Sequence, residues 1–274
     1  MVEVTRRDTP RTAYSVLERR ATIAIAAALL LLAAIAWWRI IALAPGMDGM
    51  TMGLAAVGAA MPFDMGVFVF LGMWTTMMVA MMFPTVAPIV LLHRMVMRRA
   101  GHGVSATVVF GAGYLTIWAV TGLVPLVMLV AFRDVAHGTA WIATAAGIVL
   151  VIAGLYQFTP WKQTCLHACR TPLTFLATHN FGASLSGAFR AGASHGLYCL
   201  GCCWALMAVL FVVGLMNLVW MAGIALIFLV EKHLSRDAWF TRVVGTAVAL
   251  FGVVVLAQPH LLEVFTPEMP AMTM

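Results

Sequence analysis

The sequence predicts an all-α fold, a polytopic membrane helix bundle with about seven transmembrane helices. Hydrophobic residues make up 63% of the 274 residues and charged residues only 9%, a composition far from that of soluble domains. Uncharged stretches long enough to cross a bilayer recur along the chain. The expected spans lie at about 21–44, 66–92, 104–132, 140–158, 193–213, 215–230 and 240–258.

The first span and the apolar run at 193–230 cannot be assigned from apolar length alone. Residues 21–36 resemble the apolar core of a signal peptide, but Trp37–Arg39 interrupts the small-residue region that cleavage requires. The first span is therefore expected to remain as an uncleaved anchor. Residues 193–230 form one apolar run that is too long for a single crossing. We expect a tight helical hairpin at Gly214–Asn217, with Asn217 satisfying backbone groups in the turn.

Basic residues are distributed asymmetrically across these spans. Fourteen of the 16 Lys and Arg residues fall on one side, and only Arg39 and Arg133 fall on the other. The positive-inside rule then places the N-terminus in the cytoplasm and the C-terminus outside a bacterial cytoplasmic (inner) membrane. Residues 1–20 form a cytoplasmic tail, 21–258 a single transmembrane domain and 259–274 a Met-rich outer tail. The net charge of +6 reflects orientation in the lipid bilayer, and no basic stripe indicates a nucleic-acid partner.

Methionines form two adjoining rows in the second span. Met73, Met77 and Met81 recur every four residues, and Met78 and Met82 form a second row beside them. At 1.5 Å per residue, the five thioethers cover about 13 Å of helix axis. Methionine also fills irregular gaps between membrane helices. Five on adjoining stripes of one span nevertheless favour a thioether-lined face.

A second methionine pattern falls in segments that are expected to lie outside the membrane. The first outer loop and the C-terminal end both read Met-x-x-Met-Thr-Met, and their methionines are Met47, Met50, Met52, Met269, Met272 and Met274. Core filling does not explain methionines in exposed loops, whereas contact with lipid headgroups could. Clustered thioethers prefer Cu(I) over Zn(II) or hard cations. We expect these residues to bind a soft metal ion.

Cysteines occur in two short phrases and nowhere else. The residues are Cys165, Cys169, Cys199, Cys202 and Cys203. Spacings of three and four residues place the thiols of each phrase on one helix face. His195 lies one turn before Cys199, on the same face as the thiols of the second phrase. Glycines at 192, 196 and 201 permit close approach of another helix. The two phrases can therefore meet near the inner membrane face and offer up to five sulfurs and one imidazole.

Charged residues flank both phrases. Lys162 and Arg170 lie beside the first phrase, and positive charge favours the thiolate that binds metals. Glu231 and Lys232 are adjacent and are expected to form a neighbouring ion pair at a helix end.

Four interpretations of the cysteines remain open. Free cysteine is a small hydrophobic residue common in buried positions. A structural disulfide is disfavoured on the reducing cytoplasmic side. A thiol redox relay is compatible with the Cys-x-x-Cys spacing, although the soluble fold that usually carries this motif is absent. A soft-metal site fits the number, spacing and flanking charge best.

Three phrases resemble one known family, bacterial integral membrane proteins described as predicted metal-binding. The phrases are Met73-Trp74 through Met81-Met82-x-Pro84, Tyr156-Gln-x-x-Pro160-x-Lys162-x-x-Cys165-x-x-x-Cys169-Arg170-x-Pro172, and Gly196-Leu-Tyr-Cys199-Leu-Gly-Cys202-Cys203-Trp204. The resemblance covers roughly residues 66–235. It implies a bundle of membrane helices that binds metal, and it supplies no reaction.

Together these observations predict a membrane protein that binds Cu(I) and takes it up, stores it or delivers it; zinc is the less favoured metal. Outer methionines would capture the ion, the second span would pass it inward, and the cysteines would hold it. A membrane thiol-disulfide oxidoreductase is the first alternative. An accessory or assembly subunit of a copper-containing membrane complex is the second, with a copper chaperone or copper-dependent enzyme as partner. No nucleotide loop or catalytic triad indicates an enzyme. Transport direction and oligomeric state stay open.

Overall fold

The computed structural model describes residues 9–43, 67–132, 141–178, 184–215, 217–235 and 237–258, and every element in this part of the chain is helical. The N-terminal half contains α1 (Thr9–Leu43), α4 (Val67–Arg99), α5 (Val104–Thr121), α6 (Leu123–Phe132) and α7 (Trp141–Tyr156). The C-terminal half contains α8 (Pro160–Arg170), α9 (Pro172–Thr178), α10 (Leu185–Val213), α11 (Leu218–Leu229), the π-helix η2 (Val230–Leu234) and α12 (Trp239–Ala257). The predicted all-α class is confirmed.

Several of these helices have the length and composition of membrane spans. Five stretches qualify among the described residues: Arg19–Leu43, Val67–Arg99, Val104–Met128, Leu185–Val213 and Trp239–Ala257. A sixth crossing is possible if α7 and α8, which meet at a 62° bend, form one broken span. The remaining expected span corresponds to α11, which has only 12 residues before η2 begins. A count of seven, and the orientation of the termini, therefore stay predictions.

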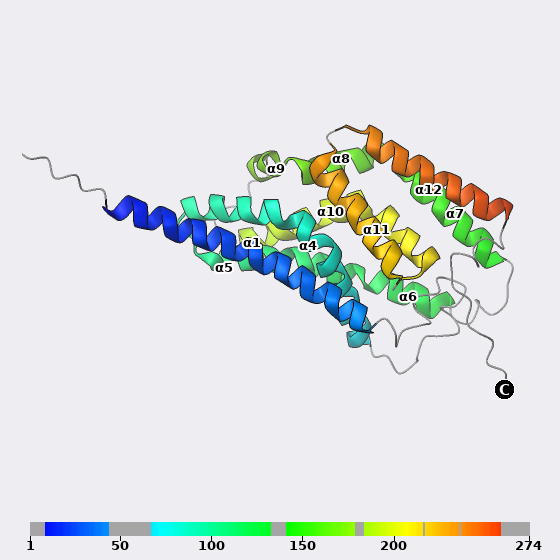
Figure 1. Cartoon of the computed structure of the whole chain (residues 1–274), viewed down its shortest axis with the longest axis horizontal. Helices are drawn as coiled ribbons and strands as arrows, with labels where there is room; N and C mark the ends of the chain where they lie inside the picture. Colours follow the sequence, from blue (N-terminus) through cyan, green and yellow to red (C-terminus); the bar gives the residue numbers. More distant parts are fainter. Residues whose placement is uncertain are drawn as a thin grey trace, which may run out of the picture.

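The helices pack mainly in pairs. In Figure 1, α1 lies along α4 and α7 lies along α12, while α5 packs along α10. Glycines allow the backbones of these pairs to approach closely. A Cβ atom on Gly192 of α10 would come within 1.9 Å of the Phe110 carbonyl oxygen in α5, and one on Gly154 of α7 within 2.5 Å of the Ala249 nitrogen in α12. Small residues thus set the helix contacts, as expected for membrane bundles.

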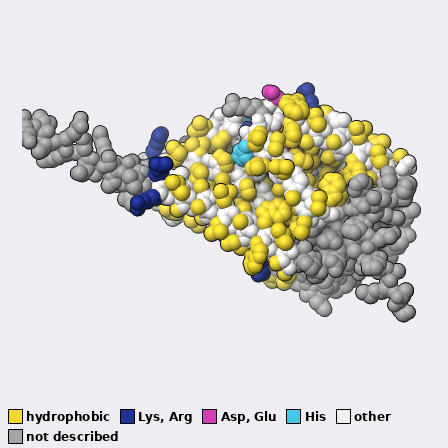
Figure 2. All heavy atoms as spheres, in the orientation of Figure 1, with side chains coloured by type: hydrophobic (Ala, Val, Ile, Leu, Met, Phe, Trp, Pro, Cys, Tyr) yellow, Lys and Arg dark blue, Asp and Glu magenta, His cyan; other side chains and the backbone are white. Residues whose placement is uncertain are grey.

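The outer surface of the bundle is apolar. Hydrophobic side chains cover most of the face seen in Figure 2, and several large ones are almost fully exposed, such as Phe68 at 89% and Val219 at 81%. The most deeply buried helices are α4 and α10. A surface of this kind is stable against lipid and unstable against water. It agrees with the expectation of a membrane protein.

The long apolar run divides at the turn expected from the sequence. Gly214 adopts a φ of 110°, a left-handed conformation that other residues rarely reach. The Asn217 side-chain oxygen then accepts hydrogen bonds from the backbone nitrogens of Val219 at 3.2 Å and Trp220 at 3.3 Å, and so caps α11. Lys232 reaches Cys199 at 3.1 Å, and these two residues lie at similar distances in sequence on either side of the turn. The chain therefore reverses direction at the predicted turn, while a second membrane crossing by α11 stays a prediction.

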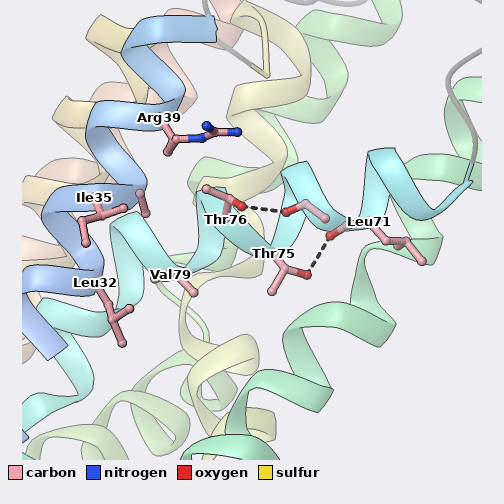
Figure 3. A pocket seen from close by; sticks show the side chains of 9 residues that line it. Leu32, Ile35, Arg39, Leu71, Thr75, Thr76 and Val79 are labelled. Atoms are coloured by element: carbon pink, nitrogen blue, oxygen red, sulfur yellow. Dashed lines mark hydrogen bonds between the residues drawn. The ribbon is translucent and has the colours of Figure 1, made fainter. Parts of the chain in front are cut away.

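A groove with a volume of about 530 Å³ lies between α1 and α4. Arg39 extends over it from α1, and Thr75 and Thr76 line it from α4 (Figure 3). Both threonine hydroxyls donate to carbonyls of their own helix, at 2.7 Å and 2.8 Å. The lining includes none of the cysteines, so the groove is separate from the sulfur cluster described below.

Candidate metal centre

Three cysteine sulfurs from two helices come together inside the bundle. The Sγ atoms of Cys169 in α8 and of Cys199 and Cys202 in α10 all lie within 4.8 Å of one another. Across the two helices, Cys169 Sγ lies 3.9 Å from Cys202 Sγ. Cys199 and Cys202 are both buried, and Cys169 is half-buried. The two phrases expected to meet therefore do so, through one cysteine of the first and two of the second.

The spacing of the three sulfurs suits a single metal ion. Metal–thiolate bonds are about 2.3 Å long in zinc sites, and three sulfurs at that distance around one ion would lie about 4.0 Å apart. The observed separations reach 4.8 Å at most, so small side-chain rotations would complete the set. Three thiolates with no carboxylate among them select soft ions. Within the described residues, this is the one group of three metal-ligating side chains so closely placed.

The other two cysteines lie next to this set. The Cys203 thiol donates to the Cys199 carbonyl oxygen at 2.8 Å, and its side chain is fully buried. The Cys165 sulfur packs against the backbone of Gly201, where an added Cβ atom would approach it to 2.6 Å. Gly201 is therefore needed for α8 to approach α10, as expected from the sequence. A ligand role for Cys165 and Cys203 stays a prediction.

Local sequence sets the position of α8. Thr159 caps its first turn by accepting from the Lys162 backbone nitrogen at 3.3 Å, and Pro160 at the first helical position favours the helix start. Just before the bend, the Tyr156 hydroxyl donates to the Gly201 carbonyl oxygen at 2.7 Å. These contacts tie the α7–α8 bend to the segment of α10 that carries the cysteines.

A buried ion pair ties the other side of α8 to η2. Lys162 Nζ lies 2.8 Å from Glu231 Oε2, and the two side chains are 0% and 2% exposed. Arg170 Nε donates to the Glu231 backbone oxygen at 2.7 Å. The two cations of α8 thus contact Glu231. Arg170 also lies close enough to Cys169 and Cys202 for a charge interaction, so the expected positive charge near the thiols is present at this residue.

The expected ion pair between Glu231 and Lys232 is wrong. Glu231 binds Lys162, and Lys232 points into the sulfur cluster instead. Its ammonium nitrogen lies 3.1 Å from Cys199 Sγ, 3.3 Å from Thr85 Oγ1 and 4.0 Å from Met82 Sδ. The adjacent residues Glu231 and Lys232 therefore contact different helices, α8 and α10. An ammonium group this close stabilises negative charge on the Cys199 sulfur.

A second polar neighbour of Cys199 was not expected from the sequence. The hydroxyl of Tyr114 in α5 lies 3.2 Å from Cys199 Sγ, and both side chains are buried. Cys199 thus has Lys232 from η2 and Tyr114 from α5 as partners, in addition to the other thiols. A buried tyrosine usually finds a hydrogen-bond partner, but the sequence contains no signal that the partner is this sulfur.

His195 lies in an aromatic environment one turn before Cys199. Its ring packs against Phe175 at 5.2 Å, Tyr114 at 6.0 Å and Phe110 at 6.5 Å between ring centroids. It does not belong to the three-sulfur group. The imidazole is buried and its Nδ1 has no hydrogen-bond partner among the described residues. A metal-binding role for His195 stays a prediction.

Four of the five span methionines are buried: Met77, Met78, Met81 and Met82. Met73, at the N-terminal end of the row, is half-buried. Met82 is the member that reaches the cysteines, through its contact with the Lys232 ammonium. The outer methionines Met47, Met50, Met52, Met269, Met272 and Met274 lie outside the described residues.

The fold and the site define a helical protein with an apolar surface and a buried set of thiols suited to a soft metal ion. The chain belongs to the PpoB2 family, described as copper chaperone, whose family model matches residues 71–255. The match runs from the first turns of α4 through most of α12. It includes the three-sulfur set and Lys232 and leaves out both Met-x-x-Met-Thr-Met segments. Searches among curated proteins and among solved structures found no match. Family and cysteine cluster together indicate copper binding, as the sequence predicted.

Proposed function

We propose that the protein is a membrane-embedded copper chaperone that holds one Cu(I) ion on Cys169, Cys199 and Cys202 and passes it to a partner. The observation that carries the proposal is the convergence of these three sulfurs, from helices α8 and α10, within 4.8 Å. Thiolates prefer soft ions, and Cu(I) is the physiological ion that best fits an all-sulfur set. The family description supports the same metal. The protein acts by binding and handover, without chemical turnover.

The route to this site follows α4 in the proposed mechanism. Buried thioethers extend from Met77 to Met82, and Met82 shares the Lys232 ammonium with Cys199. Met73 and the outer methionines would deliver Cu(I) to this row from outside a bacterial cytoplasmic membrane. Thioethers bind Cu(I) more weakly than thiolates, so affinity rises from Met82 to the cysteines. This gradient favours uptake or delivery over export.

The test is elemental analysis of protein purified in detergent under anaerobic conditions, with and without added Cu(I). We expect about one copper per chain, in line with one three-sulfur set. The variants C169S, C199S and C202S should each lose most of it. Retention of copper by all three variants would refute the assignment.

The matched control is C203S. Cys203 is adjacent to Cys202 on α10, equally buried, and its hydrogen bond to the Cys199 carbonyl oxygen can be kept by a serine hydroxyl. If three sulfurs hold the ion, C203S retains copper. Loss of copper in C203S would extend the site to the wider cluster predicted from the sequence.

The receiving partner would be a copper-dependent membrane enzyme or a second copper carrier, and the protein would then be an accessory or assembly factor for it. Delivery requires that ligands of the acceptor replace the cysteines one at a time. Cys169, which is half-buried and comes from a different helix than the other two, is the natural first ligand to exchange. Transfer of copper from the loaded wild-type protein to a dithiol acceptor tests this step: if Cys169 exchanges first, it should react with an alkylating reagent before Cys199 and Cys202 do.

A further inference from the structure

Lys232 is the one lysine in contact with the sulfur cluster, and its surroundings are unusual for an ammonium group. The residue is only 6% exposed. Its nitrogen contacts the Cys199 sulfur, the Thr85 hydroxyl and the Met82 thioether, and the Phe228 ring lies 5.8 Å away. In the described part of the chain two carboxylates lie near η2: that of Glu231 is bound to Lys162, and that of Asp237 is exposed. A buried cation without a carboxylate needs another source of negative charge, and the Cys199 sulfur is the group in contact that can carry it.

A soft cation at the position of the Lys232 ammonium would contact the same two sulfurs. A thiol sulfur and a thioether sulfur approach the ammonium from two helices, α10 and α4. Both are ligands for Cu(I), and neither is a usual partner of lysine. The ammonium thus lies between the last sulfur of the methionine row and the first sulfur of the cysteine set, where an ion moving between them must pass.

We propose that Lys232 is a tethered substitute for the cargo ion: its ammonium holds the position beside Cys199 and Met82 in the empty protein and leaves it when a soft monovalent cation binds. This inference rests on the proposed function and specifies the charge of the ion. The exchange replaces one positive charge beside the Cys199 thiolate by another, and each thiol of Cys169 or Cys202 that coordinates the ion releases its proton to solvent. A divalent ion would add a charge beside the Cys199 thiolate, which is costly in a region of low dielectric constant.

The structure provides a path for the displaced ammonium. Lys232 lies in η2, and the next two residues, His233 and Leu234, are exposed. A lysine side chain can keep its apolar stem in the bundle while its charged end reaches water. We therefore expect the ammonium to move from the sulfur cluster to the protein surface beside His233 and Leu234 by rotation of its own side chain.

The sequence makes this movement directly measurable, because the chain has only two lysines, Lys162 and Lys232. An amine-acylating reagent followed by mass spectrometry reports on each. Ag(I) serves as a monovalent soft ion that does not change oxidation state. We expect Ag(I) to raise the labelling rate of Lys232 by about tenfold or more, since labelling of a buried group follows the population of its exposed form.

Lys162 is the internal control. It is fully buried in its ion pair with Glu231, so its labelling should stay low with and without Ag(I). Both lysines should react in denatured protein. In C199S, which loses a ligand of the ion, Ag(I) should leave Lys232 labelling unchanged. A rise at Lys162 equal to that at Lys232 would indicate general loosening of the bundle and would overturn the proposal.

Bound silver is measured in the same samples, which separates two kinds of failure. If Ag(I) does not bind in a cysteine-dependent manner, the proposed function fails. If it binds and Lys232 stays unreactive, or if Lys232 is already reactive without metal, the substitution of ammonium by the ion is wrong. If Cd(II) at the same free concentration binds to the same extent and exposes Lys232 equally, the assignment to monovalent ions is wrong.

Discussion

The buried pair of Lys162 and Glu231 gives the sharpest test of how the three-cysteine cluster is held together. Its nitrogen and oxygen are 2.8 Å apart and its side chains are almost fully buried. At this distance the attraction is about 6 kcal/mol for an effective dielectric constant of about 20. Part of it offsets the cost of removing both charges from water. Replacing Lys162 by Met leaves Glu231 buried and unpaired, which costs about 3–5 kcal/mol.

The expected result for K162M is a large loss of stability together with a loss of copper. For a chain of this size, that free energy corresponds to a fall in Tm of roughly 10 °C, measured by tryptophan fluorescence in detergent. Copper binding should weaken because the pair joins α8, which carries Cys169, to η2. A K162M/E231L double variant removes both charges and should regain most of the stability, since an apolar pair of similar volume is often neutral. A Tm of K162M within about 2 °C of the wild type, or no recovery in the double variant, would refute the reasoning.

Two further predictions concern helix contact and thiol chemistry. G192A should destabilise the protein by about 2 kcal/mol or more through overpacking, because the new Cβ would lie 1.9 Å from the Phe110 carbonyl oxygen. The control is G223A in α11, which has open space around it and should be neutral or slightly stabilising. Thermal unfolding of the two variants checks both expectations. Mild oxidation of metal-free protein should join Cys169 to Cys202, whose sulfurs are 3.9 Å apart. Peptide mapping after alkylation would contradict this if Cys165 pairs with Cys169 and Cys199 with Cys202, the pairs that the oxidoreductase alternative requires.

The sequence predicts most of the helical architecture because the length of each apolar run indicates how often the chain can cross a membrane. A run too long for one crossing must turn somewhere, and Gly214 and Asn217 supply the backbone freedom and the cap for a turn at that point. Helical spacing likewise predicts that Cys199 and Cys202 share a face. The bend between α7 and α8 is less visible, because Pro160 shows where a helix starts and carries no information on the 62° angle.

The contacts of the charged residues could not be predicted in the same way. Adjacent Glu231 and Lys232 suggest a local ion pair, yet consecutive residues on a helix point in directions about 100° apart. Glu231 therefore faces α8, and Lys232 faces α10 and α4. The partner of Glu231 lies 69 residues earlier in the chain, and no periodic pattern connects two positions so far apart. Such pairs become visible only once the helices are placed.

Two neighbouring residues of the π-helical turn η2 act on the three-cysteine cluster from different sides. Turns of this type are rare in proteins overall, and those that occur are frequently found at functional sites. Here the turn follows directly on α11, so it places Glu231 and Lys232 at the end of the hairpin, level with Cys199. Glu231 fixes the helix that brings Cys169, and Lys232 supplies the charge beside Cys199. The two residues have separable roles: changes at Glu231 should act on stability and on the approach of α8, whereas changes at Lys232 should act on the ion that the thiols accept.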